Sequence, residues 1–281
     1  MAVGRLIISL SSIPPRFSRI RPTLQSLLAQ ATPADRVLLY IPRKYRRFPE
    51  WDGVLPDVPE GVEIRRTEDD LGPATKVLCA AREFQGQDCG IIFCDDDRYY
   101  PPDMVTRFTR LSAAHPDCAI ALVGRQAETI GESTGQRDKH PRAVRRWRVT
   151  DVDFQLRFLW SQIRAGRNWR KVAAPHRRVY KRSGYVDVFE GCGGVLVRPE
   201  FFDDMAYDIP PVLWTVDDVW LSGMIARRGV GIWLEANLMD PPETEADTHA
   251  PLAFSVIEGA DRGVANRMAV KYMQDHFGIW A

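Results

Sequence analysis

Ile91-Ile92-Phe93-Cys94-Asp95-Asp96-Asp97 is the stretch that decides the fold and points to the chemistry. Its first four residues are all apolar, and such a short unbroken run is typical of a strand buried on both faces of a parallel sheet. Three carboxylates follow the strand directly. Because ligands of open α/β sheets bind beyond the carboxyl ends of the strands, we expect the functional site at these three residues.

Short apolar runs alternate with helical patterns on both sides of this strand. We expect further strands at residues 6–10, 37–41, 62–64, 119–123, 193–197 and 230–234. We expect helices at residues 20–30, 75–84, 101–115, 217–228 and 258–277. This alternation predicts an α/β fold, with a Rossmann-like, mostly parallel central sheet and helices on both of its faces. No repeat or clean boundary divides the chain, so we expect residues 1–281 to form a single domain.

The composition is that of an ordinary globular protein. Of the 281 residues, 45% are apolar and 27% are charged, which excludes a disordered chain and a coiled-coil rod. The net charge of +1 gives no general attraction to nucleic acid or membrane. Residues 137–182, called the basic segment below, hold fifteen Lys or Arg and three acidic residues. We expect this segment, which carries +12 and leaves −11 elsewhere, to run over the sheet and either bind an anionic partner or form a solvated surface.

The cysteines and the amino terminus indicate a reducing compartment. The five cysteines form no Cys-x-x-Cys pair, so we expect buried free thiols. The first apolar run is too short for a signal peptide, and no run is long enough to span a bilayer. We therefore expect a cytoplasmic protein. Peripheral contact with the inner face of the membrane through the basic segment stays open.

The three adjacent carboxylates suit a metal ion. They repel one another beside an apolar strand, and a bound cation relieves that repulsion. Carboxylate oxygens suit hard ions such as Mg²⁺ or Mn²⁺, which commonly bridge to substrate phosphates. The alternative is an acidic turn that caps the next helix, although Asp103 is better placed at the start of that helix. The scattered histidines form no zinc-binding pattern.

Five segments in a fixed order carry a resemblance to a known family. Beside the Asp-x-Asp of residues 95–97, they are Ser11-Ser12-Ile13-Pro14-Pro15-Arg16, Asp69-Asp70-Leu71-Gly72-Pro73-Ala74-Thr75-Lys76, Gly191-Cys192-Gly193-Gly194 and Thr215-Val216-Asp217-Asp218-Val219-Trp220-Leu221. With these segments the chain resembles bacterial glycosyltransferases of the GT-A fold, which use nucleotide sugars. The basic segment is unmatched. The resemblance implies a nucleotide-sugar-binding half at residues 1–125 and an acceptor-binding half at residues 126–281.

For the donor, the resemblance implies Mn²⁺ or Mg²⁺ as the cofactor. Asp97 would bind the metal directly, Asp95 would share the ion or hold the ribose, and His249 would complete the metal or diphosphate site. The departing nucleoside diphosphate gains negative charge, which a divalent metal would neutralise as a Lewis acid.

Other donor contacts are implied in the same way. The residues that would bind the nucleotide sugar are Ser11, Arg16, Asp69, Asp70, Lys76, Asp95 and Asp96. Lys76 would neutralise the phosphates, and Arg82 is a weaker candidate for that role. Asp69 and Asp70 would accept hydrogen bonds from the base; alternatively, they only begin a turn before Gly72.

For the acceptor, the resemblance implies Asp218 as the general base, with Asp217 beside it. A carboxylate that takes the proton of an attacking hydroxyl favours an inverting outcome, although a retaining mechanism stays open. Alternatively, one of the two carboxylates only caps the helix that they begin. The expected acceptor-binding residues are Glu190, Gly193, Gly194 and Trp214.

The function that we expect is metal-dependent sugar transfer from a nucleotide diphosphate sugar, with a UDP-sugar favoured. The acceptor would be a glycan or a lipid-linked glycan, including an anionic one, and no nucleic acid partner is expected. The absence of Walker A and Gly-x-Gly-x-x-Gly patterns disfavours a P-loop ATPase or a standard NAD enzyme. The alternative is a non-catalytic module that binds a polyanion through residues 137–182. Its binding would depend on salt and would survive loss of Asp97.

Overall fold

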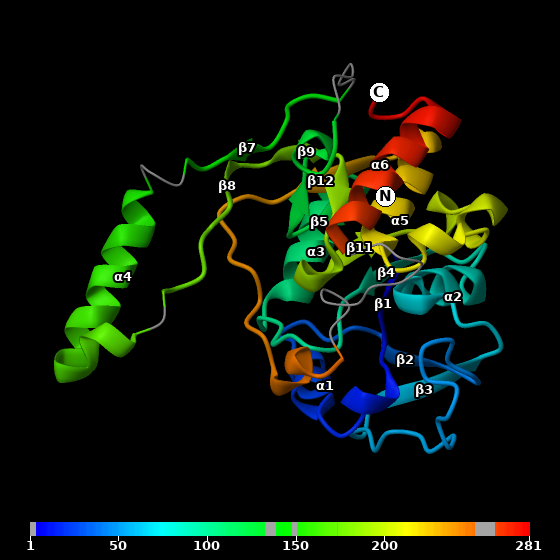
Figure 1. Ribbon diagram of the computed structural model, residues 1–281, viewed down its shortest axis with the longest axis horizontal. Helices are drawn as coiled ribbons and strands as arrows, with labels where there is room; N and C mark the ends of the chain where they lie inside the picture. Colours follow the sequence, from blue (N-terminus) through cyan, green and yellow to red (C-terminus); the bar gives the residue numbers. More distant parts are fainter. Residues whose placement is uncertain (1–3, 133–138, 148–150, 173, 251–261) are drawn as a thin grey trace.

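The computed structural model describes residues 4–132, 139–147, 151–172, 174–250 and 262–281. Its main body is an eight-stranded sheet between two layers of helices (Figure 1). The strands of this sheet are β1 (Arg5–Ser11), β2 (Arg36–Pro42), β3 (Val62–Thr67), β4 (Cys89–Phe93), β5 (Cys118–Ala121), β9 (Gly184–Val186), β11 (Val195–Val197) and β12 (Gly231–Leu234). The helices are α1 (Arg21–Leu28), α2 (Thr75–Glu83), α3 (Met104–Ala114), α4 (Val152–Ala165), α5 (Asp217–Arg227) and α6 (Arg262–Phe277).

The sheet is mostly parallel, as the sequence predicts. Its order is β3-β2-β1-β4-β11-β5-β12-β9. The neighbours β3-β2-β1-β4 and the pair β5-β12 are parallel. Strand β11 runs antiparallel between β4 and β5, and β9 runs antiparallel at the edge. Two short pairs lie outside this sheet, β6 (Gly124–Arg125) with β10 (Val188–Phe189) and β7 (Val144–Arg145) with β8 (Tyr180–Arg182).

Helices cover both faces of the sheet because the central strands are apolar on both sides. In β4, Ile91 faces one core and Ile92 the other, and both are fully buried. The core around Ile91 includes side chains of α2, α5 and α6, whereas the core around Ile92 includes side chains of α1 and α3. A helix–sheet–helix sandwich results, which confirms the expected fold class.

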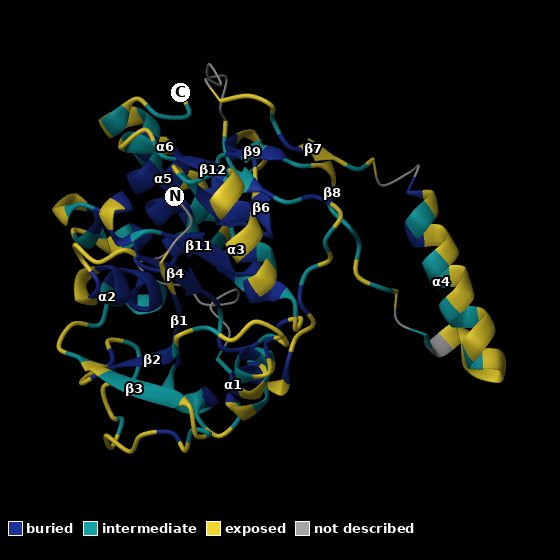
Figure 2. Cartoon of the chain, turned by 180° about the vertical axis from the view of Figure 1, so that it is seen from behind, coloured by how far each residue is buried: buried dark blue, intermediate teal, exposed yellow. Residues whose placement is uncertain are grey.

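The basic segment differs from the expectation. It contains a helix, α4, and this helix stands apart from the sheet instead of lying over it (Figures 1 and 2). The chain reaches α4 through β7 and returns from it through β8. The side chain of Asp151 caps the helix by accepting a hydrogen bond from the Phe154 N–H. Within the described ranges, no helix is long and apolar enough to cross a membrane.

Replacement of Ile92 by alanine tests the central position of β4. Because Ile92 has no exposed surface, Ile92→Ala is expected to lower the free energy of unfolding by about 2–5 kcal/mol. The matched control is Val54→Ala, since Val54 is 64% exposed and its replacement should change stability by no more than about 0.5 kcal/mol. Urea unfolding measures both, and equal effects would contradict the buried position of β4.

Candidate functional site

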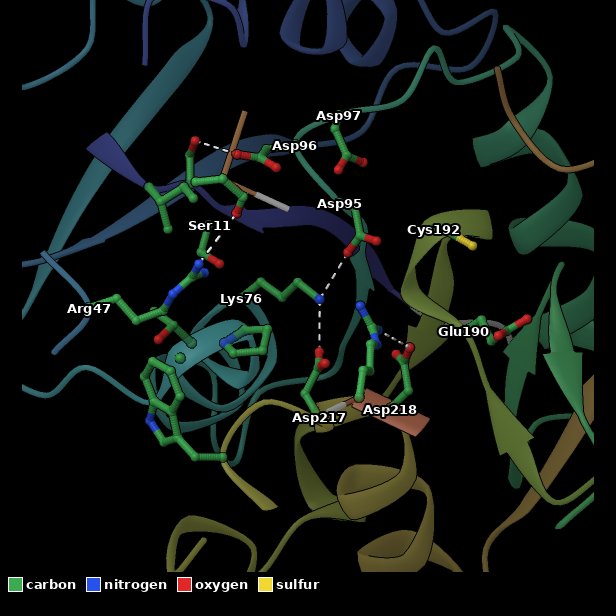
Figure 3. A pocket seen from close by; sticks show the side chains of 18 of the residues that line it. Ser11, Arg47, Lys76, Asp95, Asp96, Asp97, Glu190, Cys192, Asp217 and Asp218 are labelled. Carbon is green, nitrogen blue, oxygen red and sulfur yellow. Dashed lines mark hydrogen bonds and ion pairs between the residues drawn. The ribbon is translucent and has the colours of Figure 1, made fainter. Parts of the chain in front are cut away.

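A cavity of about 530 Å³ lies at the carboxyl ends of β1 and β4, opposite the start of α5 (Figure 3). Its volume falls within the range of small-molecule sites. It brings together residues that the sequence places far apart. The predicted site residues that line it are Ser11, Arg16, Asp70, Lys76, Asp95, Asp96, Asp97, Glu190, Trp214, Asp217 and Asp218.

Lys76 joins the two acidic motifs. It lies in the first turn of α2 and is only 5% exposed. Its Nζ donates to Asp95 Oδ1 at 2.9 Å and to Asp217 Oδ2 at 2.8 Å (Figure 3). Burial opposes the charge of Lys76, but Asp217 and Asp95 raise its pKa well above that of a free lysine. Burial also opposes ionisation of Asp95, yet Lys76 lowers its pKa. Through these two ion pairs Lys76 links the end of β4 to the start of α5.

Arg16 holds the other carboxylates of the Asp-x-Asp stretch. It ends the 3₁₀ helix η1 (Pro14–Arg16), which follows β1. Its Nη1 donates to Asp96 Oδ1 at 2.6 Å and to Asp97 Oδ2 at 2.8 Å. Ser12 donates to the second oxygen of Asp96. One guanidinium nitrogen thus bridges two adjacent carboxyl groups, and the parallel pairing of β1 with β4 brings them within reach.

Asp97 is less well compensated than its neighbours. Burial raises its pKa to about 7, and the charges of Asp95 and Asp96 act in the same direction. Among the described residues, its buried Oδ1 has no hydrogen-bond partner; Arg98 Nε lies 3.4 Å away. Further positive charge near this oxygen would stabilise the ionised form.

Asp218 lies next to the glycine-rich loop. Its Oδ1 accepts the backbone N–H of Gly191 at 3.0 Å, and Arg262 of α6 lies 4.0 Å from Oδ2. Burial raises the pKa of Asp218 well above its usual value, and Asp217 adds to that effect. The two carboxylates bind groups outside α5, and Val216 is the N-cap of that helix. The capping alternative is therefore wrong for both.

Close packing explains why residue 191 is a glycine. A Cβ there would lie 3.1 Å from Asp95 Oδ1 and 3.3 Å from Lys76 Nζ. Both distances are tight for a Cβ, so glycine lets the backbone approach these charged groups without displacing them. Cys192 also lines the cavity, but burial raises the pKa of its thiol well above the usual value, so it stays protonated. A thiol in that state is a poor nucleophile.

Asp70 mainly shapes a loop. One carboxylate oxygen accepts the N–H of Gly72 at 2.9 Å and the other accepts the N–H of Arg46 at 2.7 Å. For Asp70 these contacts match the alternative from the sequence, that it begins the turn before Gly72. Gly72 has a φ of +61°, and a Cβ there would lie 2.7 Å from the Trp214 ring. Trp214 closes this side of the cavity against the loop.

Four predicted site residues do not line the cavity. Asp69 is exposed and lies 3.8 Å from Arg82. Gly193 and Gly194 pack behind the cavity, against Val123 and Phe108. The backbone carbonyl of His249 accepts a hydrogen bond from Arg16 Nε at 2.9 Å. The imidazole of His249 instead contacts Thr248 and the carbonyl of Glu245.

Several lining residues carry no signal in the sequence. Those that the sequence did not single out include Tyr45, Arg47, Arg98, Arg125, Arg262 and Asn266. Arg125 pairs with Glu190 at 2.6 Å, and Arg262 approaches Asp218 from α6. Lone arginines outside any motif look like surface residues, and only their position in the fold shows otherwise.

Replacement of Lys76 tests the buried charge that joins the motifs. Lys76→Met leaves Asp95 and Asp217 without their cation and is expected to cost about 3–5 kcal/mol of stability. The control is Lys271→Met, because Lys271 is 73% exposed, pairs with Asp275 on α6 and should cost about 0.3–0.5 kcal/mol.

Urea unfolding compares these two variants. Adding Asp217→Asn to Lys76→Met should recover part of the loss, because it removes one unpaired charge. A cost for Lys76→Met as small as that for Lys271→Met would contradict the buried ion pairs.

Comparisons with known proteins give remote similarity only. No protein-family model matches the chain, and no curated protein matches it. A crystal structure of S. aureus TarS residues 1–349 is 12% identical, with a TM-score of 0.44, over 84% of this chain and 59% of that one. The same fragment in complex with UDP is 10% identical, with a TM-score of 0.40. A third TarS structure is 12% identical, with a TM-score of 0.44, and 36% of it is covered. The chain thus spans 59% of the first of these structures, and its function is inferred from the site itself.

Proposed function

We propose that the chain transfers a sugar from a nucleoside diphosphate sugar, with UDP favoured, to a hydroxyl of a glycan or a lipid-linked glycan. One observation carries this proposal: a single cavity holds Asp95–Asp97 on one wall and Asp217 and Asp218 on the other, with Lys76 between them (Figure 3). Sugar transfer needs cations for a departing diphosphate and a base for the attacking hydroxyl, and this cavity has both.

Arg16 and Lys76 are the cations suited to the diphosphate. Both are buried in the cavity wall and are bound to carboxylates. The negative charge that develops on the leaving group would be stabilised by these fixed positive groups without their having to move far. Arg47 and Arg98 add positive charge to the same cavity.

Asp97 Oδ1 is the atom of the site that is best suited to bind a divalent metal, Mn²⁺ or Mg²⁺. Asp97 Oδ1 is buried without a hydrogen bond among the described residues, and burial, together with Asp95 and Asp96, raises the pKa of Asp97. Asp97 would hold the ion, with Asp95 beside it. The described residues form no ready-made group of three His, Cys, Asp or Glu ligands. Donor phosphates and water would supply the remaining ligands, as is usual for Mg²⁺, and the ion would act as a Lewis acid on the phosphates.

Asp218 is the base that we propose for the acceptor. The acceptor oxygen forms a bond to the anomeric carbon, the bond from that carbon to the diphosphate breaks, and the hydroxyl proton passes to Asp218. A carboxylate with a raised pKa is a stronger base than an exposed aspartate. Attack opposite the leaving group would invert the anomeric centre. Glu190, paired with Arg125, and Trp214 lie on the cavity wall where they would contact an acceptor sugar.

Thermal unfolding with nucleotides tests the donor site. UDP, GDP and CMP are each added with and without Mn²⁺. At 100 times its dissociation constant, a bound nucleotide should stabilise the fold by about 2.7 kcal/mol. We expect UDP with Mn²⁺ to give the largest shift. No shift with any nucleotide in a folded sample would contradict the proposal.

Asp97→Asn and Asp69→Asn form a matched pair for the metal. Asp97→Asn should lose the Mn²⁺-dependent part of the UDP shift, because it removes the proposed ligand. Asp69→Asn should keep that part, since Asp69 is exposed and lies outside the cavity. An equal Mn²⁺-dependent UDP shift in the two variants would show that Asp97 does not bind the metal. Salt-dependent polyanion binding that persists in Asp97→Asn, without any nucleotide shift, would favour the non-catalytic alternative.

A further inference from the structure

The basic segment forms an arm that projects from the body. The arm consists of β7, α4, the 3₁₀ helix η4 (Gly166–Lys171) and β8. Both views show α4 standing clear of the sheet and its covering helices, with the body on one side only (Figures 1 and 2). Figure 2 shows exposed and intermediate residues along α4, with little of the helix buried.

One face of α4 is anchored within the arm. Phe154 is 7% exposed, and the guanidinium of Arg177 lies 3.5 Å from the centre of its ring. Arg157 on the same face donates to Asp153 and to the carbonyl of His176. The returning segment before β8 thus covers this face and fixes the rotation of the helix.

The opposite face of α4 is an exposed apolar stripe. Its residues recur at helical spacing, and all are more than half exposed: Val152 (63%), Leu156 (60%), Leu159 (53%), Trp160 (59%) and Ile163 (61%). At 100° per residue they fall within a sector of about 100°. Elsewhere in the described ranges the exposed apolar side chains are scattered or, at Val54 and Leu55, form one adjacent pair, but a continuous stripe of this kind needs an explanation.

Positive charge lies at the carboxyl-terminal end of this stripe. Arg164, Arg167 and Arg170 are exposed at and beyond the end of α4. The guanidinium of Arg164 lies 5.7 Å from the Trp160 ring, and that of Arg170 lies 5.1 Å from the ring of Trp169, which is 48% exposed. Tryptophan and arginine side by side at the edge of an apolar helix face are typical of segments that lie in a membrane interface.

We propose that α4 and η4 dock in the interfacial layer of an anionic lipid bilayer, with the apolar stripe among the upper acyl chains and the arginines at the headgroups. Charge complementarity favours this occupant, because the basic segment carries +12 whereas the rest of the chain carries −11. Two arms packed against each other in a dimer would bring like charges together. A nucleic acid would use the arginines but would leave the apolar stripe exposed.

Vesicle co-sedimentation tests the proposal with the whole protein. Vesicles contain either phosphatidylcholine alone or phosphatidylcholine with phosphatidylglycerol at 7:3. We expect at least tenfold stronger binding to the anionic vesicles. Leu156→Ser with Ile163→Ser should weaken that binding about tenfold or more without any change of charge. Arg164→Gln with Arg167→Gln and Arg170→Gln should weaken it about fivefold per charge removed.

Two controls separate the arm from the rest of the molecule. Val54→Ser with Leu55→Ser removes exposed apolar side chains (64% and 38% exposed) from the body and should leave vesicle binding unchanged. Asp97→Asn should bind vesicles like the wild type, because the proposal does not depend on the proposed sugar transfer. Circular dichroism confirms that each variant is folded.

Three outcomes would overturn the proposal. The first is no preference of the wild type for anionic vesicles. The second is equal vesicle binding by the wild type and by Leu156→Ser with Ile163→Ser, since the apolar stripe would then play no part. The third is a wild-type oligomer in sedimentation velocity that these two substitutions convert to a monomer, without vesicle binding by either. The stripe would then pair copies of the chain.

Discussion

The site depends on one buried positive charge, the ammonium group of Lys76 between Asp95 and Asp217. A charge this deep is tolerated because two carboxyl groups lie within 3 Å of the Lys76 nitrogen. The contact joins α2, the end of β4 and the start of α5, which come from distant parts of the chain. Placing these elements around one ammonium group also places Asp97 and Asp218 on opposite sides of the same cavity (Figure 3).

The direction of the strands explains how the glycine-rich loop reaches that cavity. Parallel β1 and β4 both end at it, so the residues that follow them form its wall. Strand β11 runs the other way, and the segment that precedes it therefore lies at the same edge. Glu190 and the N–H of Gly191 reach the cavity from that segment. One reversed strand thus adds a wall that a wholly parallel sheet would not have.

The sequence alone predicts the sheet and the first acidic wall, because the apolar run before Asp95–Asp97 carries both signals in one place. The second wall, Asp217 and Asp218, is expected only from the resemblance. It does not predict that Arg16 binds Asp96 and Asp97, since the pairing of β1 with β4 brings together residues that are 80 and 81 positions apart. The role of Arg262 is equally hidden in the sequence, because only the position of α6 in the fold brings it near Asp218. The helix α4 is missed for another reason: its apolar residues recur at helical spacing but have no core to face, and arginines interrupt them.

The arm is closed at its base, where Val144 pairs with Arg182 and Arg145 with Tyr180. The two ends of the excursion are therefore held together by β7 and β8, whatever lies between them. The entropy of closing a loop grows only slowly with its length, so residues can be added to or removed from the arm at little cost to the folding of the sheet. The arm, which would bind the membrane surface, can thus change in evolution while the cavity stays the same.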